Sequence, residues 1–83
     1  MAQVRKLLLV DDDEDLRSSL AEQLMLHEEF TILQAATGAE AVAVARSQSP
    51  DLILLDVGLP DMDGREAVKL LRREGYANPI LMV

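Results

Sequence analysis

The chain has 83 residues, which is enough for one domain and no more. Hydrophobic residues make up 49% and charged residues 28%, a balance typical of a folded globular protein rather than a disordered one. The net charge of −7 argues against a chain that grips the phosphates of nucleic acids, and the absence of cysteine excludes disulfides and thiolate metal sites. The apolar runs are far shorter than the about 18 residues that a membrane span needs, and Asp11 comes too early for a signal peptide.

Residues 7–10, Leu-Leu-Leu-Val, predict a first strand. A run without alternation is typical of a strand buried on both faces, and such strands belong to parallel sheets that helices cover. Residues 14–27 then predict a helix, in which Leu16, Leu20 and Leu24 recur every four residues and form an apolar face.

Residues 30–35 predict a second strand, and its Thr31 and Gln34 favour a position at the edge of the sheet. Thr37 and Glu40 match a capping box, which predicts a helix that begins there and runs to about Ser47. The proline that follows at position 50 ends this segment.

Residues 52–56, Leu-Ile-Leu-Leu-Asp, predict a third strand, and the Gly- and Pro-containing residues 57–63 read as a loop. Asp63 can cap a third helix over 64–74, and Gly75 can end it. Residues 80–83 begin a fourth strand. Strands that alternate with helices at this spacing predict right-handed crossovers and a parallel sheet.

Acidic residues follow two of the predicted strands. Asp11 and Asp12 end the first strand, and Asp56 ends the third. Ligands of open parallel sheets bind beyond the carboxyl ends of the strands, so these carboxylates converge if the two strands are neighbours. A hard divalent cation would neutralise them, and Mg²⁺ needs only two or three carboxylates beside its waters. An ionised Asp next to Mg²⁺ can attack phosphorus and form an acyl phosphate.

The remaining acidic residues near these strands have simpler interpretations. Asp13, Glu14 and Asp15 are read as the acidic first turn of a helix, where negative charge favours the helix dipole. Asp61 is read as a loop charge, and the following Asp63 as a helix cap.

The sequence resembles the receiver domain of bacterial two-component response regulators. The resemblance rests on LLLVDDDEDLR at residues 7–17 and DLILLDVGLPDMDGREAVKLLR at residues 51–72, and it runs without a gap from about Lys6 to Val83. The pattern DxxLPxxxG is formed by Asp56, Leu59, Pro60 and Gly64. At its distance from the acid pair Asp11 and Asp12, it is highly specific for this family.

The resemblance implies an α/β fold with a doubly wound parallel sheet, flavodoxin-like, in strand order 2-1-3-4-5. It implies that Asp56 is the phosphoacceptor, Asp12 a direct Mg²⁺ ligand, Asp11 a ligand through water and Gly58 a main-chain carbonyl ligand, with Mn²⁺ as an alternative metal. The expected partner is a histidine kinase in the cytoplasm. The chain would assist its own phosphorylation rather than act as a conventional enzyme, and would switch conformation to control an output such as transcription.

Receiver domains also carry a Ser or Thr at the end of strand four and a Lys at the end of strand five, and this chain reaches neither. We therefore expect residues 1–83 to be the N-terminal two-thirds of a receiver domain, with strand five and the last two helices absent. An output domain, DNA-binding in many members, would follow beyond residue 83, whereas this segment would bind neither nucleic acid nor membrane. A fourth strand left at an edge would favour a homodimer.

Three other functions fit parts of the sequence. Asp11, Asp13, Asp15 and Glu22 match ligand positions of an EF-hand calcium loop, although Leu16 replaces the glycine of its sharp turn.

An aspartate-based phosphohydrolase would use the Asp11-x-Asp13 spacing at the end of a strand, but the chain is short for that fold and Asp15 stands where Thr or Val is expected. The last alternative is a binding or interaction fragment that is not competent for phosphorylation, because half of a receiver site would lie outside it.

Overall fold

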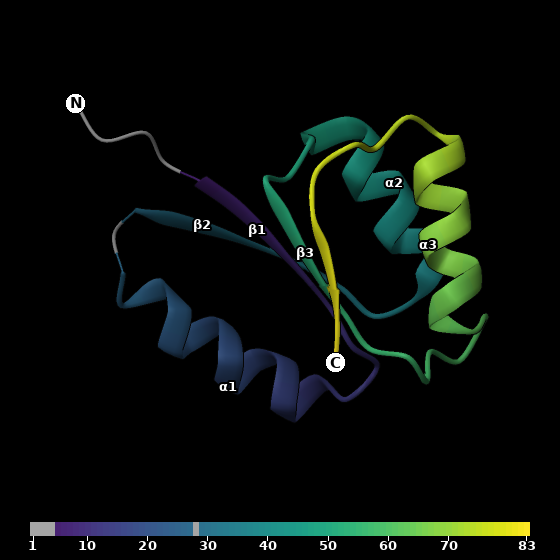
Figure 1. Ribbon diagram of the computed structural model, residues 1–83. Coiled ribbons are helices and arrows are strands. Elements are labelled where there is room, and N and C mark those ends of the chain that lie inside the picture. Colours follow the sequence, from purple (N-terminus) through teal and green to yellow (C-terminus); the bar gives the residue numbers. More distant parts are fainter. Residues whose placement is uncertain (1–4, 28) are drawn as a thin grey trace.

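The computed structural model describes residues 5–27 and 29–83 as one parallel sheet with helices on both faces (Figure 1). The four strands lie in the order β2-β1-β3-β4, as predicted, and the second strand is at an edge, also as predicted. The elements in chain order are β1 Arg5–Val10, α1 Glu14–Met25, β2 Phe30–Ala35, α2 Gly38–Gln48, β3 Leu52–Leu55, α3 Gly64–Arg73 and β4 Ile80–Met82.

The central strand β1 is buried on both faces, which confirms the interpretation of its unbroken apolar run. Leu8 and Val10 pack with α2 and α3 on one side of the sheet, whereas Leu7 and Leu9 pack with α1 on the other. None of the four side chains is more than 5% exposed. Burying each one fully contributes roughly 1.5–3 kcal/mol, so this strand supplies a large share of the core.

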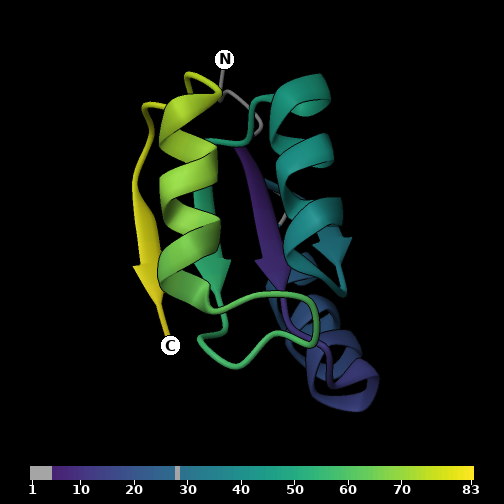
Figure 2. The ribbon, with the colours of Figure 1, turned by 90° about the vertical axis from the view of Figure 1, so that its right-hand side faces the viewer.

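The two faces of the sheet are covered unequally. Figures 1 and 2 show α2 and α3 side by side over one face, while α1 alone lies on the other. Helix α1 rests on β1 and β2 through Ala21 and Leu24, close to Ile32 of β2. The part of this face formed by β3 and β4 therefore has no helix over it among the described residues.

The apolar face predicted for the first helix is only partly buried. Leu24 packs against the sheet, but Leu16 and Leu20 are 49% and 39% exposed. The physical reason is the position of α1 over β1 and β2, which turns these two leucines toward the uncovered side, where they line a small groove with Leu54 of β3. The helix also ends at Met25 rather than His27, because the last N–H groups bond to carbonyls three residues back.

The first strand begins at Arg5, two residues before the predicted Leu7, and the remaining predicted boundaries agree to within one residue. The Thr37 hydroxyl accepts from the N–H of Glu40, and the Asp63 carboxylate accepts from the N–H of Arg65, so both predicted caps are confirmed. Gly75 ends α3 at a φ of 94°, a left-handed conformation that favours glycine. Within the described ranges, no helix has the length and apolar character needed to cross a membrane.

Candidate functional site

The sheet brings the predicted site residues to one edge. Strands β1 and β3 are adjacent and parallel, with Val10 paired to Leu55, so the next residues of both strands leave the sheet side by side. Main-chain hydrogen bonds continue past the strand ends: the N–H of Asp56 donates to the carbonyl of Val10 at 2.9 Å, and that of Asp11 donates to Ala35 at 3.1 Å. The backbone at the site is therefore fixed by the sheet.

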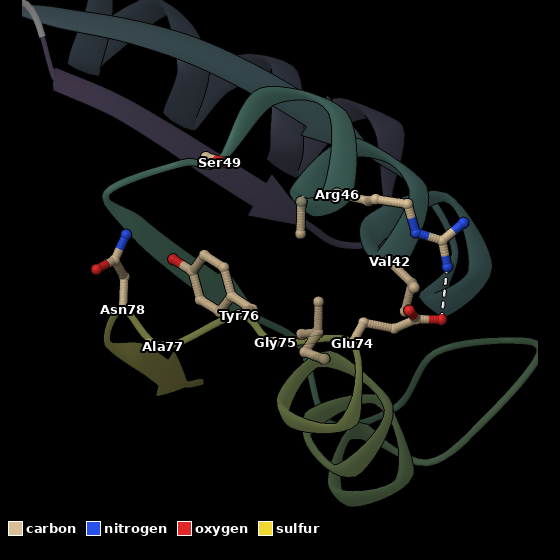
Figure 3. A pocket seen from close by; sticks show the side chains of 10 residues that line it. Val42, Arg46, Ser49, Glu74, Gly75, Tyr76, Ala77 and Asn78 are labelled. Carbon is tan, nitrogen blue, oxygen red and sulfur yellow. Dashed lines mark hydrogen bonds and ion pairs between the residues drawn. The ribbon is translucent and has the colours of Figure 1, made fainter.

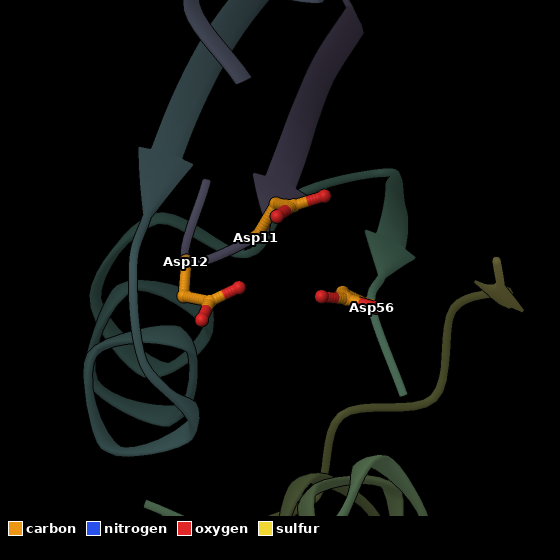
Figure 4. Close-up of side chains that lie close together, drawn as sticks. All are labelled: Asp11, Asp12 and Asp56. Atoms are coloured by element: carbon orange, nitrogen blue, oxygen red, sulfur yellow. The ribbon is translucent and has the colours of Figure 1, made fainter. Parts of the chain in front are cut away.

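Three carboxylates meet at this edge, as predicted. One oxygen each of Asp11, Asp12 and Asp56 lies within 4.8 Å of the others, and Figure 4 shows Asp12 and Asp56 pointing toward each other. Asp12 is exposed and the other two are half-buried. At that separation two carboxylates repel by about 1 kcal/mol in water and about 3 kcal/mol at the effective dielectric of a protein surface. Neutralising this repulsion is what a cation would contribute.

No cationic side chain forms a salt bridge with these carboxylates within residues 5–27 and 29–83. The guanidinium of Arg17 donates instead to the main-chain carbonyl of Asp11 and to the side-chain oxygen of Gln34. Asp11 accepts a hydrogen bond from the N–H of Asp13 at 2.9 Å. These contacts orient the loop after β1 while leaving the carboxylates without a counter-ion among the described residues. No sequence pattern predicted this role of Arg17.

Gly58 lies next to the cluster, on the loop that leaves β3. Its N–H donates to Asp56 Oδ1 at 3.3 Å, and it forms an isolated antiparallel bridge with Asp63 at the other end of the same loop. The predicted role of its carbonyl as a metal ligand remains a prediction. Hard oxygen donors in the number found here are the donor set that Mg²⁺ prefers.

Asp61 differs from its interpretation as a simple loop charge. Its Oδ1 accepts from the N–H of Gly38 at 2.8 Å, and its Oδ2 accepts from the N–H of Ala39 at 3.0 Å. These two hydrogen bonds lower the pKa of the Asp61 carboxyl. Asp61 thus caps α2 from a loop 23 residues away from Gly38, and no local pattern could reveal such a contact.

A cavity lies at the opposite end of the sheet. It has a volume of about 290 Å³ and lies between the C-terminal ends of α2 and α3 (Figure 3). Its polar groups are paired: Arg46 with Glu74, and the Tyr76 hydroxyl with the carbonyl of Pro50 at 2.9 Å. Burial raises the pKa of the Tyr76 phenol. These contacts stabilise the packing of α2 and α3.

The EF-hand alternative is wrong for this fold. Residues from Glu14 onward are helical, and the Asp13 carboxylate accepts from the N–H of Leu16 at 3.1 Å as the cap of α1. An EF-hand loop needs its ligand positions on one continuous loop, and here only Asp11 of the four contributes to the carboxylate cluster.

Comparisons with known proteins agree with this geometry. A family model described as "Response regulator receiver domain" matches residues 7–83. The chain is 40% identical over 79 residues to the alkaline phosphatase synthesis transcriptional regulatory protein PhoP of Bacillus subtilis, covering 95% of this chain and 32% of that protein. It is 44% identical over 78 residues to a protein-glutamate methylesterase/protein-glutamine glutaminase of Rhodospirillum rubrum, covering 94% of this chain and 21% of that one.

Among solved structures, the chemotaxis response regulator CheY4 of Vibrio cholerae superposes with a TM-score of 0.87 at 35% identity, covering 96% of this chain and 68% of that one. The chain spans about a third of the length of the first curated relatives that it matches.

Proposed function

This chain belongs to the response regulator receiver domains, the phosphorylated signalling domains of two-component systems, and on that premise we propose that Asp56 is its phosphoacceptor. The observation that carries the proposal is the meeting of Asp11, Asp12 and Asp56 within 4.8 Å at the carboxyl edge of the sheet. The sheet holds the N–H groups of Asp11 and Asp56 alike, and Asp56 is favoured as the acceptor because it opens the DxxLPxxxG pattern on which the resemblance to receiver domains rests.

In the proposed reaction, a carboxylate oxygen of Asp56 attacks the phosphorus of a phosphohistidine on a histidine kinase. A new O–P bond forms, the N–P bond breaks, and its electron pair returns to the imidazole, so the product is an acyl phosphate on Asp56. No general base is required because the carboxylate is already an anion. The chain would thus assist its own phosphorylation without being a conventional enzyme.

We propose that Asp12 and Asp56 hold Mg²⁺, or Mn²⁺ in its place, with Asp11 acting through water and Gly58 through its main-chain carbonyl. The bound ion would offset the charge of the three carboxylates and of the incoming phosphoryl group. Arg17 keeps the Asp11 main chain in place during this step, because its guanidinium donates to the Asp11 carbonyl.

The partners beyond the site are proposals as well. We propose that residues 1–83, of which 1–4 and 28 lie outside the described structure, correspond to the N-terminal two-thirds of a receiver domain that works with a cytoplasmic histidine kinase. The stored acyl phosphate would shift the domain between two conformations and so control an output. The matched relatives include both transcription regulators and a methylesterase, so a DNA-binding output is one proposal among several.

The experiment is labelling with a small phosphodonor in Mg²⁺, read by intact mass spectrometry. In a chain extended through strand five, the wild type and Asp51→Asn, a control at the amino end of the strands, are expected to gain one phosphoryl group, whereas the 83-residue chain alone should gain it much more slowly or not at all. Asp56→Asn is expected to gain none. Labelling of Asp56→Asn at the wild-type rate would reject Asp56 as the acceptor. A wild type that binds Mg²⁺ but is never labelled would favour the alternative of an interaction module without phosphorylation.

We also propose that a polypeptide of these 83 residues pairs through β4. Leu81, Met82 and Val83 are 54%, 43% and 79% exposed, and no charged residue or proline interrupts this edge. Leu81→Lys should shift the molecular mass measured by light scattering toward the monomer. A wild-type monomer at high concentration would contradict the homodimer.

A further inference from the structure

The loop that joins β3 to α3, residues 56–63, reaches across to the first turn of α2, beneath the helix in Figure 2. Its contact there is made by the two oxygens of Asp61, which accept from the N–H groups of Gly38 and Ala39. The acceptor candidate Asp56 lies at the start of this same loop. A single side chain thus joins the loop of the candidate site to a neighbouring helix.

Asp61 supplies the partners of the first two N–H groups of helix α2. The Thr37 hydroxyl accepts from the N–H of Glu40, and the Thr37 carbonyl accepts from the N–H of Ala41. The N–H groups of Gly38 and Ala39 lie beyond the reach of that cap, and Asp61 takes both. Because helix N-termini favour negative charge, the ionised carboxylate is held in this position.

An apolar contact reinforces the polar one. A Cβ atom placed on Gly38 would lie 2.5 Å from the sulfur of Met62, so the helix and the loop approach as closely as glycine permits. Met62 also packs against the main core cluster. The tip of the loop is therefore docked on α2 by two adjacent residues, one through hydrogen bonds and one through packing.

The base of the loop is equally constrained. The N–H of Gly64 donates to the carbonyl of Val57 at 2.9 Å, and Gly58 pairs with Asp63 across the loop. A Cβ on Gly64 would lie 2.9 Å from the Cα of Val57, so the two arms of the loop touch. A displacement at Asp61 is consequently passed to Gly58 and Asp56 rather than absorbed along the way.

We propose that Asp61 is a positioning residue for the metal and phosphoryl site: by docking the β3–α3 loop on α2, it fixes Asp56 and the Gly58 main chain in the arrangement that binds the ion. This inference rests on the proposed function. It assigns Asp61 no contact with the ion or the phosphoryl group. The helix cap on α2 and the geometry of the site are then two consequences of one interaction.

The experiment compares Asp61→Ala with Thr37→Ala in the whole chain. Both variants remove hydrogen bonds from the first turn of α2, but only the first also releases the loop. Asp61→Ala should weaken Mg²⁺ affinity by roughly tenfold, the lower end of the range for residues that support metal ligands. Thr37→Ala should leave the affinity unchanged. Asp61→Asn, which keeps one acceptor oxygen, should recover part of the loss and serves as the readout if the alanine variant does not fold.

A second readout does not depend on the metal. In the metal-free protein, the amide NMR shifts of Val57 and Gly58 should move in Asp61→Ala and stay in place in Thr37→Ala. Equal Mg²⁺ affinities and equal loop shifts for the two variants would reduce Asp61 to a helix cap and overturn the inference. A wild type that binds no Mg²⁺ would reject the proposed function instead, while the shifts of Val57 and Gly58 would still decide whether Asp61 holds the loop.

Discussion

Polar groups are hydrogen-bonded at the amino end of the strands, whereas carboxylates face one another at the carboxyl end. At the amino end of the strands, Asp51 accepts from the N–H of Lys6 at 2.8 Å, and Tyr76 donates to the carbonyl of Pro50. At the carboxyl end, Asp12 and Asp56 face each other without a cation among the described residues. The first arrangement stabilises the fold, whereas the second destabilises it unless something binds.

In this small α/β domain, the cavity and the unpaired charge lie at different ends of the sheet. A cavity of about 290 Å³ lies at the amino end, but its Arg46 and Glu74 pair with each other and its Tyr76 hydroxyl donates to Pro50. The groove beside the acidic cluster at the carboxyl end holds only about 80 Å³, yet the carboxylates there repel one another and a cation would relieve that repulsion. Unpaired charge, rather than empty volume, identifies the candidate site here.

The largest expected effect is a loss of Mg²⁺ affinity at the carboxyl end of the sheet. Asp12→Ala should weaken Mg²⁺ affinity by at least roughly tenfold, since removing a ligand costs no less than removing a residue that supports one. Asp15→Ala is the matched control, because it removes the same charge from the exposed first turn of α1 nearby. Titration calorimetry measures both, and equal affinities would exclude Asp12 from the metal site.

The second prediction is that removing one negative charge changes the free energy of unfolding in opposite directions at the two ends. In the absence of divalent metal, Asp12→Asn should raise the free energy of unfolding by up to about 1 kcal/mol at low salt, because it relieves repulsion. Asp51→Asn should lower that free energy by about 1 kcal/mol, because it weakens a hydrogen bond to the Lys6 main chain. Urea denaturation measures both changes. If both variants changed the free energy of unfolding in the same direction, the proposed difference between the two ends would be wrong.

A smaller loss is expected from Tyr76→Phe at the amino end. The change removes the hydroxyl that donates to Pro50, and it should lower the free energy of unfolding by about 0.5–1 kcal/mol. The loss is modest because the same carbonyl also accepts from the side chain of Asn78 at 3.0 Å. Mg²⁺ affinity should be unchanged, and a large drop in affinity would show that the two ends are coupled.

The smallest expected effect is on the stability of the protein at acidic pH. The pKa of Asp61 is lowered from its usual value of 3.8 by the Gly38 and Ala39 N–H groups, so its contribution to stability is present above pH 3.8. That contribution is lost as the pH falls through the lowered pKa. Asp61→Asn should therefore flatten the acid side of the stability curve below about pH 4, without changing its shape at neutral pH. If the stability below about pH 4 fell as steeply in the variant as in the wild type, the hydrogen bonds of Asp61 to Gly38 and Ala39 would be contradicted.

The sequence was sufficient for the parts of the fold and site that depend on neighbours along the chain. Unbroken apolar runs located β1 and β3, and the acids that follow them located Asp11, Asp12 and Asp56. Asp61 and Arg17 were missed because their partners are main-chain groups that only the folded chain brings near.

The same limit explains the first helix. The four-residue spacing of its leucines correctly predicts a helix. The exposure of Leu16 and Leu20, however, depends on which strands α1 covers. That is a property of the packed layers, which no local pattern encodes.

The central place of β1 has a consequence for synthesis on the ribosome. This strand is made first, yet it pairs on one side with β2 and on the other with β3, whose residues follow about 45 positions later. At about 5–20 residues per second, the nascent strand waits roughly 2–9 s for its second partner. During that interval Leu7 to Val10 expose an apolar strand edge on the side that β3 will cover. The most buried segment of the finished domain is thus the one that a chaperone would meet first.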